Sequence, residues 1–354
     1  EFQDYVQQIT ALLRLTDPHT AMAIKAEVEN RLQILEHALQ TTAHAAPTIA
    51  DMLDIPDHIP PSNDRRAAWV KPFRQSIALG GRDPAPLQHA LQRAQQAGER
   101  EIAALLALLA QGNREAAAEQ AQRLFAVLHQ QGRLEEAYSL LLLPILVQAS
   151  LVERFRQYPL EQQRAVLQAG LQACEQGYHL SRALRDGPCQ ALFLSAKGAG
   201  LYNSRQLGAA VAAYQEALGL YRQLAHAQPE VYAPDVAATL YNLGGALADL
   251  RRYEAAVEAY QEALAIRRRL AHAQPEVYEP YVATTLTNLG VALYQLRRYE
   301  AAVEAYQEAL GLYRQLAQEQ PEVYEPYVAG TLTNLGVALA DLRRYEAAVE
   351  AYQE

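Results

Sequence analysis

The 354-residue sequence has few of the residues on which reactive or cross-linked proteins depend. Its two cysteines, Cys174 and Cys189, are too few for a disulfide framework and lack the paired spacing of a zinc site. It contains no Gly-x-x-x-x-Gly-Lys-Ser/Thr loop and no His-Glu-x-x-His pair, so a P-loop for nucleotide phosphates and this zinc-protease signature are both missing. The sequence therefore predicts a non-catalytic protein without metal or cofactor.

Positive charge is also scarce. Thirty-one basic residues stand against 40 acidic ones, which gives a net charge of −9, and this sign disfavours binding to nucleic acids or anionic membranes. The longest apolar stretch, Leu140 to Val147, is much shorter than the roughly 20 residues of a membrane-spanning helix. The low cysteine content suits a reducing compartment. We therefore expect a soluble, cytoplasmic protein with neither nucleic-acid nor membrane partners.

The sequence does contain an internal repeat with a period of 46 residues. The string Ala-Tyr-Gln-Glu recurs with this period, and so does the string Asn-Leu-Gly. The tyrosines of the first string are Tyr214, Tyr260, Tyr306 and Tyr352. The period defines three units and a partial fourth: 189–234, 235–280, 281–326 and 327–354.

Each unit is expected to form two antiparallel helices. In unit 281–326, leucines at steps of three and four predict a first helix from Tyr281 to Leu296. Arg297 and Arg298 mark a turn, the second helix is expected from Tyr299 to about Gln320, and the Pro-Glu-Val-Tyr-Glu-Pro segment is interpreted as a linker. Gly290 is placed where the two helices approach closely, so a larger residue there would force them apart.

These units resemble the tetratricopeptide repeat, with leucines in place of its first two aromatic residues. They are longer than the usual unit of about 34 residues. In this they are similar to the repeats of kinesin light chain, and to arrays attached to bacterial NB-ARC or NACHT signalling NTPases or to caspase-like proteases. The resemblance covers residues 189–354 and implies an all-α fold, an α-solenoid superhelix of helix pairs. The residues that carry it are Leu286, Leu289, Gly290, Leu293, Tyr299, Ala302, Tyr306 and Ala309.

The sequence before the array is organised differently. Residues 1–46 suggest two amphipathic helices, and residues 47–86, with seven of the 17 prolines, suggest an irregular connector whose Trp69 docks on a neighbouring helical hairpin. Residues 87–188 are interpreted as degenerate helical hairpins that cap or extend the array. The chain begins without methionine and stops inside a unit, so we expect it to be a piece of a longer protein. Its last helix is expected to fray or to be covered by a second copy of the chain.

Differences between units are concentrated on one side of the first helix. Units 235–280 and 281–326 differ at 12 positions, and six of these lie within an arc of about 140° on the first helix. Unit 327–354 departs from 281–308 only at Gly330, Ala340 and Asp341, which belong to the same arc. We call this side the variable arc. Its six pairs are Asp235/Tyr281, Ala238/Thr284, Tyr241/Thr287, Gly245/Val291, Ala248/Tyr294 and Asp249/Gln295.

Two explanations of the variable arc are open: free drift of an exposed face, or reshaping of a ligand-binding surface. The second is favoured because residues 250–264 and 296–310 are identical, although the second helices also have exposed faces. By the resemblance, this first-helix side lines a concave groove. Three asparagines within the arc do not vary, and a carboxamide can pair with a peptide backbone, although it could instead bond its own helix. The candidate ligand-binding residues are Asn242, Asn288, Asn334, Ala238, Tyr241, Gly245, Asp249, Thr284, Thr287, Val291, Tyr294, Gln295, Thr333, Val337 and Asp341.

The sequence thus favours a module that recognises a peptide or protein segment in its groove, as the sensor or docking arm of a larger bacterial signalling or defence protein. Two alternatives are a small-ligand-binding regulatory solenoid of a transcription activator and a structural scaffold for self-association. Asp249 and Asp341, with no basic residue near them on the arc, suggest a positively charged ligand. The other six differences, at the end of the second helix, are expected to adjust the rim of the groove or a contact with a further domain.

Overall fold

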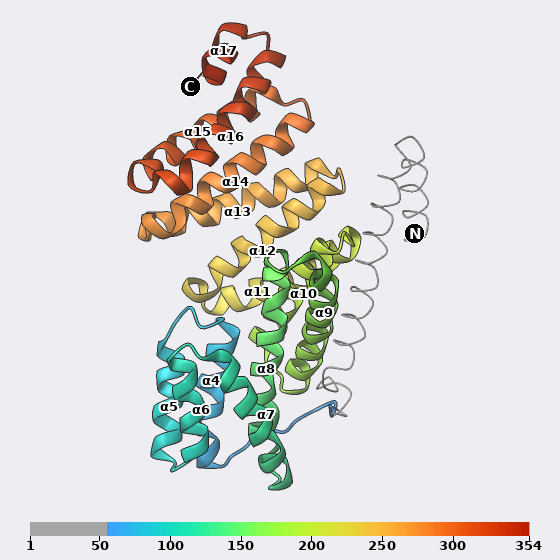
Figure 1. The fold of residues 1–354 in the computed structure, drawn as a ribbon, viewed down its shortest axis with the longest axis vertical. Helices are drawn as coiled ribbons and strands as arrows, with labels where there is room; N and C mark the ends of the chain where they lie inside the picture. Colours follow the sequence, from blue (N-terminus) through green and yellow to red (C-terminus); the bar gives the residue numbers. More distant parts are fainter. Residues whose placement is uncertain (1–54, 354) are drawn as a thin grey trace, which may run out of the picture.

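The computed structural model describes residues 55–353, which form helices and connecting loops without a β-strand (Figure 1). Consecutive helices pack against each other along the chain, which confirms the predicted all-α solenoid. The helices expected in residues 1–46 lie outside the described residues. The first part of the chain contains η1 (Arg65–Trp69), α4 (Val70–Ala78), α5 (Ala85–Gln96), α6 (Arg100–Ala110), α7 (Arg114–Gln130), α8 (Leu134–Arg154), η2 (Phe155–Gln157) and α9 (Leu160–Ala183).

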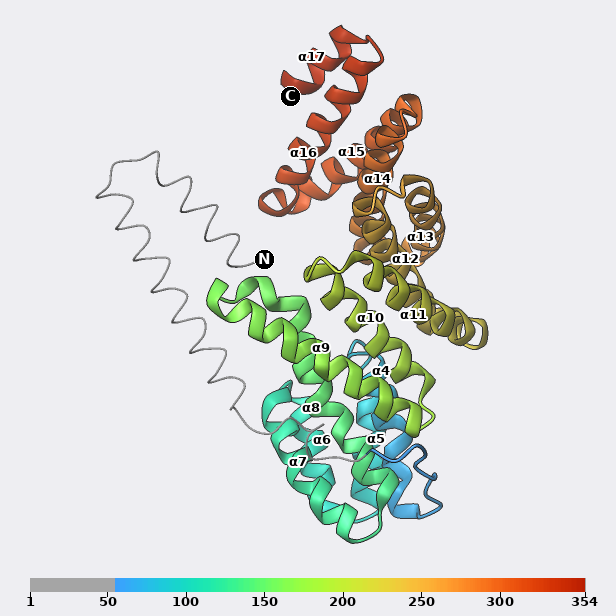
Figure 2. The same ribbon diagram turned by 90° about the vertical axis from the view of Figure 1, so that its right-hand side faces the viewer.

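The repeat array follows as eight helices that form antiparallel pairs and curve away from the first part (Figures 1 and 2). One hydrophobic core runs through this array, and a second lies within the first part of the chain. The array helices are α10 (Gly187–Asn203), α11 (Leu207–Ala227), α12 (Pro229–Asp249), α13 (Tyr253–Ala273), α14 (Pro275–Gln295), α15 (Tyr299–Glu319), α16 (Pro321–Asp341) and α17 (Tyr345–Gln353).

The first helix of each unit begins earlier than predicted. The Pro-Glu-Val-Tyr-Glu-Pro segment is not a linker, because α14 already begins at Pro275. Proline is well suited to the first helical position, and Pro280 lies close enough to the start to remove only one intrahelical hydrogen bond. Gln274 alone joins α13 to α14. Two 21-residue helices with a three-residue turn and this single joint account for the 46-residue period.

The turn within each unit is a Schellman motif built on arginine. Arg297 has a positive φ of 57°, its N–H bonds the Tyr294 carbonyl at 2.9 Å, and the Arg298 N–H bonds the Leu293 carbonyl at 3.0 Å. These bonds satisfy carbonyl groups at the end of α14. The equivalent residues Arg205, Arg251 and Arg343 have the same left-handed conformation, and so does Arg185 before α10, whereas turns nearer the start of the chain use glycines such as Gly112 and Gly132.

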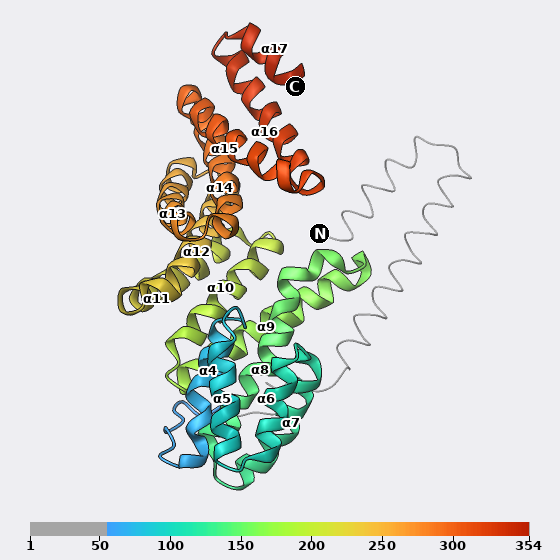
Figure 3. The ribbon, with the colours of Figure 1, turned by 90° about the vertical axis from the view of Figure 1, so that its left-hand side faces the viewer.

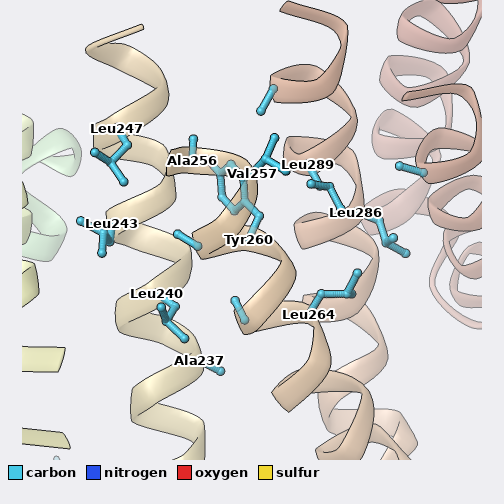
Figure 4. Packing of buried hydrophobic residues seen from close by; sticks show 14 of the residues in the cluster. Ala237, Leu240, Leu243, Leu247, Ala256, Val257, Tyr260, Leu264, Leu286 and Leu289 are labelled. Carbon is cyan, nitrogen blue, oxygen red and sulfur yellow. The ribbon is translucent and has the colours of Figure 1, made fainter. Parts of the chain in front are cut away.

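Helices within a unit are held close by a glycine that faces a tyrosine ring. A Cβ atom on Gly290 would lie 2.6 Å from Cε1 of Tyr306, which is too close for a carbon–carbon contact. This confirms the predicted close approach. Figure 4 shows the preceding pair, where the α13 ring of Tyr260 lies between apolar side chains of α12 and α14. The leucine stripe of each first helix is buried against these rings.

The proline-rich region is more ordered than the predicted connector, because η1 and α4 occupy residues 65–78. Trp69 is fully buried and its indole N–H donates to Glu136 of α8 at 3.1 Å. The predicted docking of Trp69 on a helical hairpin is therefore confirmed.

One helical segment of the described residues, Leu134–Gln157, is long and apolar enough to cross a membrane. It includes α8, and two-thirds of its most apolar window is buried in the protein.

The array is curved with its first helices on the inner side. Consecutive first helices α10, α12, α14 and α16 touch one another, while the second helices lie farther apart (Figure 3). Long side chains bridge neighbouring second helices: Arg222 of α11 pairs with Glu262 of α13 at 2.6 Å, and Arg268 of α13 pairs with Glu308 of α15 at 2.5 Å. The first-helix side is therefore the concave one.

Candidate functional site

The structure places the fifteen candidate residues together on the concave side of α12, α14 and α16. None of them is buried, whereas the leucines of the same helices point into the core. Asp235 belongs to the variable arc but not to the fifteen candidates, and it is buried. The exposed candidates are Ala238, Asp249, Val291, Gln295, Thr333, Val337 and Asp341. The half-buried ones are Tyr241, Asn242, Gly245, Thr284, Thr287, Asn288, Tyr294 and Asn334.

The three asparagines do not bond their own helices. Asn288 donates through Nδ2 to the hydroxyl of Tyr241 at 2.8 Å, and this contact joins α14 to α12. The amides of Asn242 and Asn334 make no hydrogen bond to any side chain or backbone group of residues 55–353. The neighbouring hydroxyls behave differently, since Thr287 donates to the Ala283 carbonyl one turn earlier. Two of the three amides thus keep their donors and acceptors available on the concave side.

The carboxylates of the arc are already partnered. Arg205 Nη1 lies 3.1 Å from Asp249, and Asp341 accepts a hydrogen bond of 2.6 Å from the hydroxyl of Tyr294. This bond raises the pKa of Tyr294 to about 12. No basic residue lies near Asp249 on the arc itself, but Arg205 reaches it from outside the arc, so Asp249 no longer supports the expectation of a positively charged ligand. Sequence reasoning missed Arg205 because it belongs to the turn of the preceding unit.

Buried Asp235 connects the array to the first part of the chain. Its Oδ1 pairs with Arg82 Nη2 at 2.6 Å, and Arg82 lies in the loop between α4 and α5. Its Oδ2 is enclosed and has no hydrogen-bond partner among residues 55–353. Burial raises the pKa of Asp235, while Arg82 acts in the opposite direction. In unit 235–280, this variable position therefore makes a contact within the protein.

A buried arginine beneath the concave side was not among the sequence-based candidates. Arg267 of α13 is 6% exposed, and its guanidinium carbon lies 4.5 Å from the ring centre of Tyr241 and 5.4 Å from that of Tyr281. Its Nη1 donates to the Tyr281 carbonyl and to the Thr285 hydroxyl. The available signal was the Arg267/Tyr313 difference between units, which belongs to the group assigned to the rim.

Neither cysteine is poised for chemistry. Both are buried, and burial raises the pKa of the Cys174 thiol to about 12 and that of Cys189 well above its usual range. A thiolate nucleophile is therefore absent from both at neutral pH. In the described part of the chain, no group of three histidine, cysteine or acidic side chains is arranged to hold a metal ion.

The repeat array is an α-solenoid of helical hairpins with a concave polar surface. Family comparison matches residues 235–315 and 328–354 to tetratricopeptide repeats. The repeat array is therefore built of tetratricopeptide repeats, which are generally non-catalytic protein-interaction modules. No curated protein matches the chain.

Solved structures with a similar fold have low sequence identity to this chain. The apo form of RapI has 16% identity over 82% of this chain and 75% of that chain, with a TM-score of 0.54. BtubC from P. vanneervenii has 21% identity over 68% of this chain and 86% of that one, with a TM-score of 0.46. A signal transduction ATPase with a tetratricopeptide repeat sensor, from Pyrococcus horikoshii, has 13% identity over 95% of this chain and 58% of that one, with a TM-score of 0.49.

Proposed function

We propose that this chain is the recognition arm of a larger bacterial signalling or defence protein, and that it binds an extended peptide segment along the concave side of α12, α14 and α16. The observation that carries the proposal is the pair of amides, Asn242 and Asn334, that have no protein partner among the described residues and recur on the variable arc. A carboxamide can both donate to and accept from a peptide backbone, whatever its side chains. The varied residues between the asparagines would then select the side chains.

Substitutions of the asparagines and of the variable residues are expected to have different effects on peptide binding. Asn242→Ala and Asn334→Ala remove backbone partners, so each should weaken every bound peptide by about 1–3 kcal/mol. Replacing Tyr294 and Gln295 together by the Ala and Asp of the next unit should change which peptide is preferred, because specificity is a difference of affinities. Gln307→Ala, at an exposed site on α15, is the matched control and should change neither property.

The assay is an array of immobilised peptides probed with the wild-type chain and these variants, followed by calorimetry on the best binders. Peptide binding that survives both asparagine substitutions unchanged would contradict the assignment of the surface. Binding of a small metabolite without any peptide would instead support the regulatory-solenoid alternative. Association of the chain with itself, in the absence of peptide binding, would support the scaffold.

A further inference from the structure

Arg267 occupies a position where the flanking units have tyrosine. Tyr221 and Tyr313 are its equivalents one period before and after, and both are 2% exposed. A neutral aromatic ring is therefore the usual occupant of this buried site, and one unit of the array has a positive charge there instead. Burying a charge is unfavourable unless it is paired.

Other well-buried arginines in this chain pair with carboxylates. Arg74 lies 2.6 Å from Asp186, and Arg133 pairs with Glu136 and with Glu99. Arg267 has no carboxylate within 4.0 Å among residues 55–353. Burial lowers its pKa to about 10, so it still carries its proton at neutral pH. The tyrosine rings on either side supply cation–π attraction, which compensates part of the lost hydration.

Only one part of the guanidinium is occupied by protein groups. Nη1 donates to the Tyr281 carbonyl at 3.1 Å and to the Thr285 hydroxyl at 2.5 Å. Nε and Nη2 donate to no group of the described residues, and neither is among the enclosed polar atoms without a partner, so both reach solvent. These two nitrogens form the edge that pairs side-on with a carboxylate, as Nε and Nη2 of Arg133 do with Glu136.

The free edge lies beside the proposed peptide-binding surface. The guanidinium is held between α12, through the ring of Tyr241, and α14, through Tyr281 and Thr285. Both are first helices, and Tyr241 together with its partner Asn288 belongs to the candidate surface. A group bound against Tyr241 on the concave side would therefore lie close to the Arg267 guanidinium.

We infer that Arg267 is a carboxylate-binding site, in which an acidic group of the bound peptide pairs with Nε and Nη2 between the rings of Tyr241 and Tyr281. The inference rests on the proposed function for its peptide and adds a chemical preference to it. An aspartate or glutamate side chain and a free C-terminal carboxylate present the same group. Arginine suits this role because its planar fork matches the carboxylate geometry in a way that lysine cannot.

The first test detects the site without a peptide. The Nε–H resonance of Arg267, assigned by its loss in Arg267→Tyr, is followed by NMR while acetate replaces chloride at constant ionic strength. A saturable shift of this resonance, with no comparable shift for Arg268 at its exposed pair with Glu308, is the expected result. No shift of the Arg267 resonance up to high acetate concentration would overturn the inference. Arg267→Tyr is expected to fold because tyrosine is the residue of both flanking units.

The second test measures the preference in peptides. Three amidated libraries with the same randomised positions carry Glu, Gln or Arg at one fixed central position, and a fourth has the Gln residue with a free C-terminal carboxylate. The wild-type chain should bind the best Glu or free-acid library at least tenfold more tightly than the amidated Gln library. Arg267→Tyr should abolish this preference, Arg267→Lys should reduce it, and the control Arg268→Gln should retain it.

The outcomes separate this inference from the proposed function. Peptides that bind through Asn242 and Asn334 but show no preference for a carboxylate would refute the role of Arg267 and leave the proposed function standing. An Arg267-dependent response to acetate with no peptide binding in any library would refute the peptide and support the carboxylate site alone. Equal preferences in the wild type and Arg267→Tyr would refute the site whatever the affinity.

Discussion

Alanine substitutions at two adjacent glycines of α12 should have opposite effects on stability. A Cβ atom on Gly244 would lie 2.7, 2.8 and 3.0 Å from three ring carbons of Tyr260, which is 3% exposed and cannot swing into solvent. A Cβ atom on Gly245 would meet only the hydroxyl of the same ring, at 3.7 Å, which is an ordinary contact. Both glycines are helical, so the two substitutions share the same gain in helix propensity.

The magnitudes follow from this geometry. Replacing glycine by alanine inside a helix stabilises it by roughly 0.5–1 kcal/mol. Gly245→Ala should show this gain directly. At Gly244 the ring must retreat by close to 1 Å to restore carbon–carbon contacts of about 3.5–4.0 Å. Overpacking of this kind costs about 1–3 kcal/mol, so Gly244→Ala should be destabilising by roughly 0.5–2 kcal/mol after the propensity gain.

Hydrogen exchange of the α12 and α13 amides is the suitable assay, because a repeat array can open locally and need not unfold as one unit. Gly336→Ala is a graded comparison: its ring partner Tyr352 is 53% exposed and can move away, so its cost should be smaller. Equal protection in Gly244→Ala and Gly245→Ala would refute the close-packing explanation. So would a larger loss in Gly336→Ala than in Gly244→Ala.

Four further predictions concern the buried polar groups. Burial lowers the pKa of Arg267 to about 10 in the folded state, so its charge opposes folding at neutral pH, and this penalty fades as the pH rises through about 10. Arg267→Tyr should therefore raise the free energy of unfolding at pH 7 by roughly 2–3 kcal/mol, measured by urea titration. Trp69 should show the blue-shifted fluorescence of a buried indole, and Glu136→Leu should destabilise the chain by about 1–3 kcal/mol in thermal unfolding, since the indole N–H and Arg133 both lose their buried partner. The pKa of Asp235 is raised by burial, so its contribution to stability is present at low pH and is lost as the pH rises through the folded-state pKa. Asp235→Asn should therefore flatten the pH dependence of the free energy of unfolding in urea above the ordinary carboxyl pKa.

The repeat could be predicted well because each duplicated unit contains the same residues at the same spacing and therefore makes the same packing contacts. Gly290 and Tyr306 could be matched by their period, and the structure puts them in contact. The start of the first helix was predicted six residues too late. Prolines at 275 and 280 suggested a break, yet Pro275 is the first helical residue, where an N–H would have no intrahelical partner, and Pro280 removes only one intrahelical hydrogen bond.

The chemistry of the surface was less predictable, because it depends on contacts between units. The sequence located the variable arc, but it could not show that Arg205 neutralises Asp249 from the preceding turn or that Tyr241 binds Asn288. Arg267 was visible as a difference between units. Its burial depends on three successive helices, which no periodicity within one helix reveals.

The arginine turns of the array also bear on how such a protein can evolve. A left-handed conformation costs a residue with a side chain roughly 1 kcal/mol relative to glycine, and Arg251, Arg297 and Arg343 each adopt it. Duplication of a unit copies this strain together with the favourable interface, so the burden grows in proportion to the number of repeats. Replacing these arginines by glycine, one unit at a time, would therefore stabilise the array. That added stability could offset destabilising substitutions as the residues of the concave side diversify.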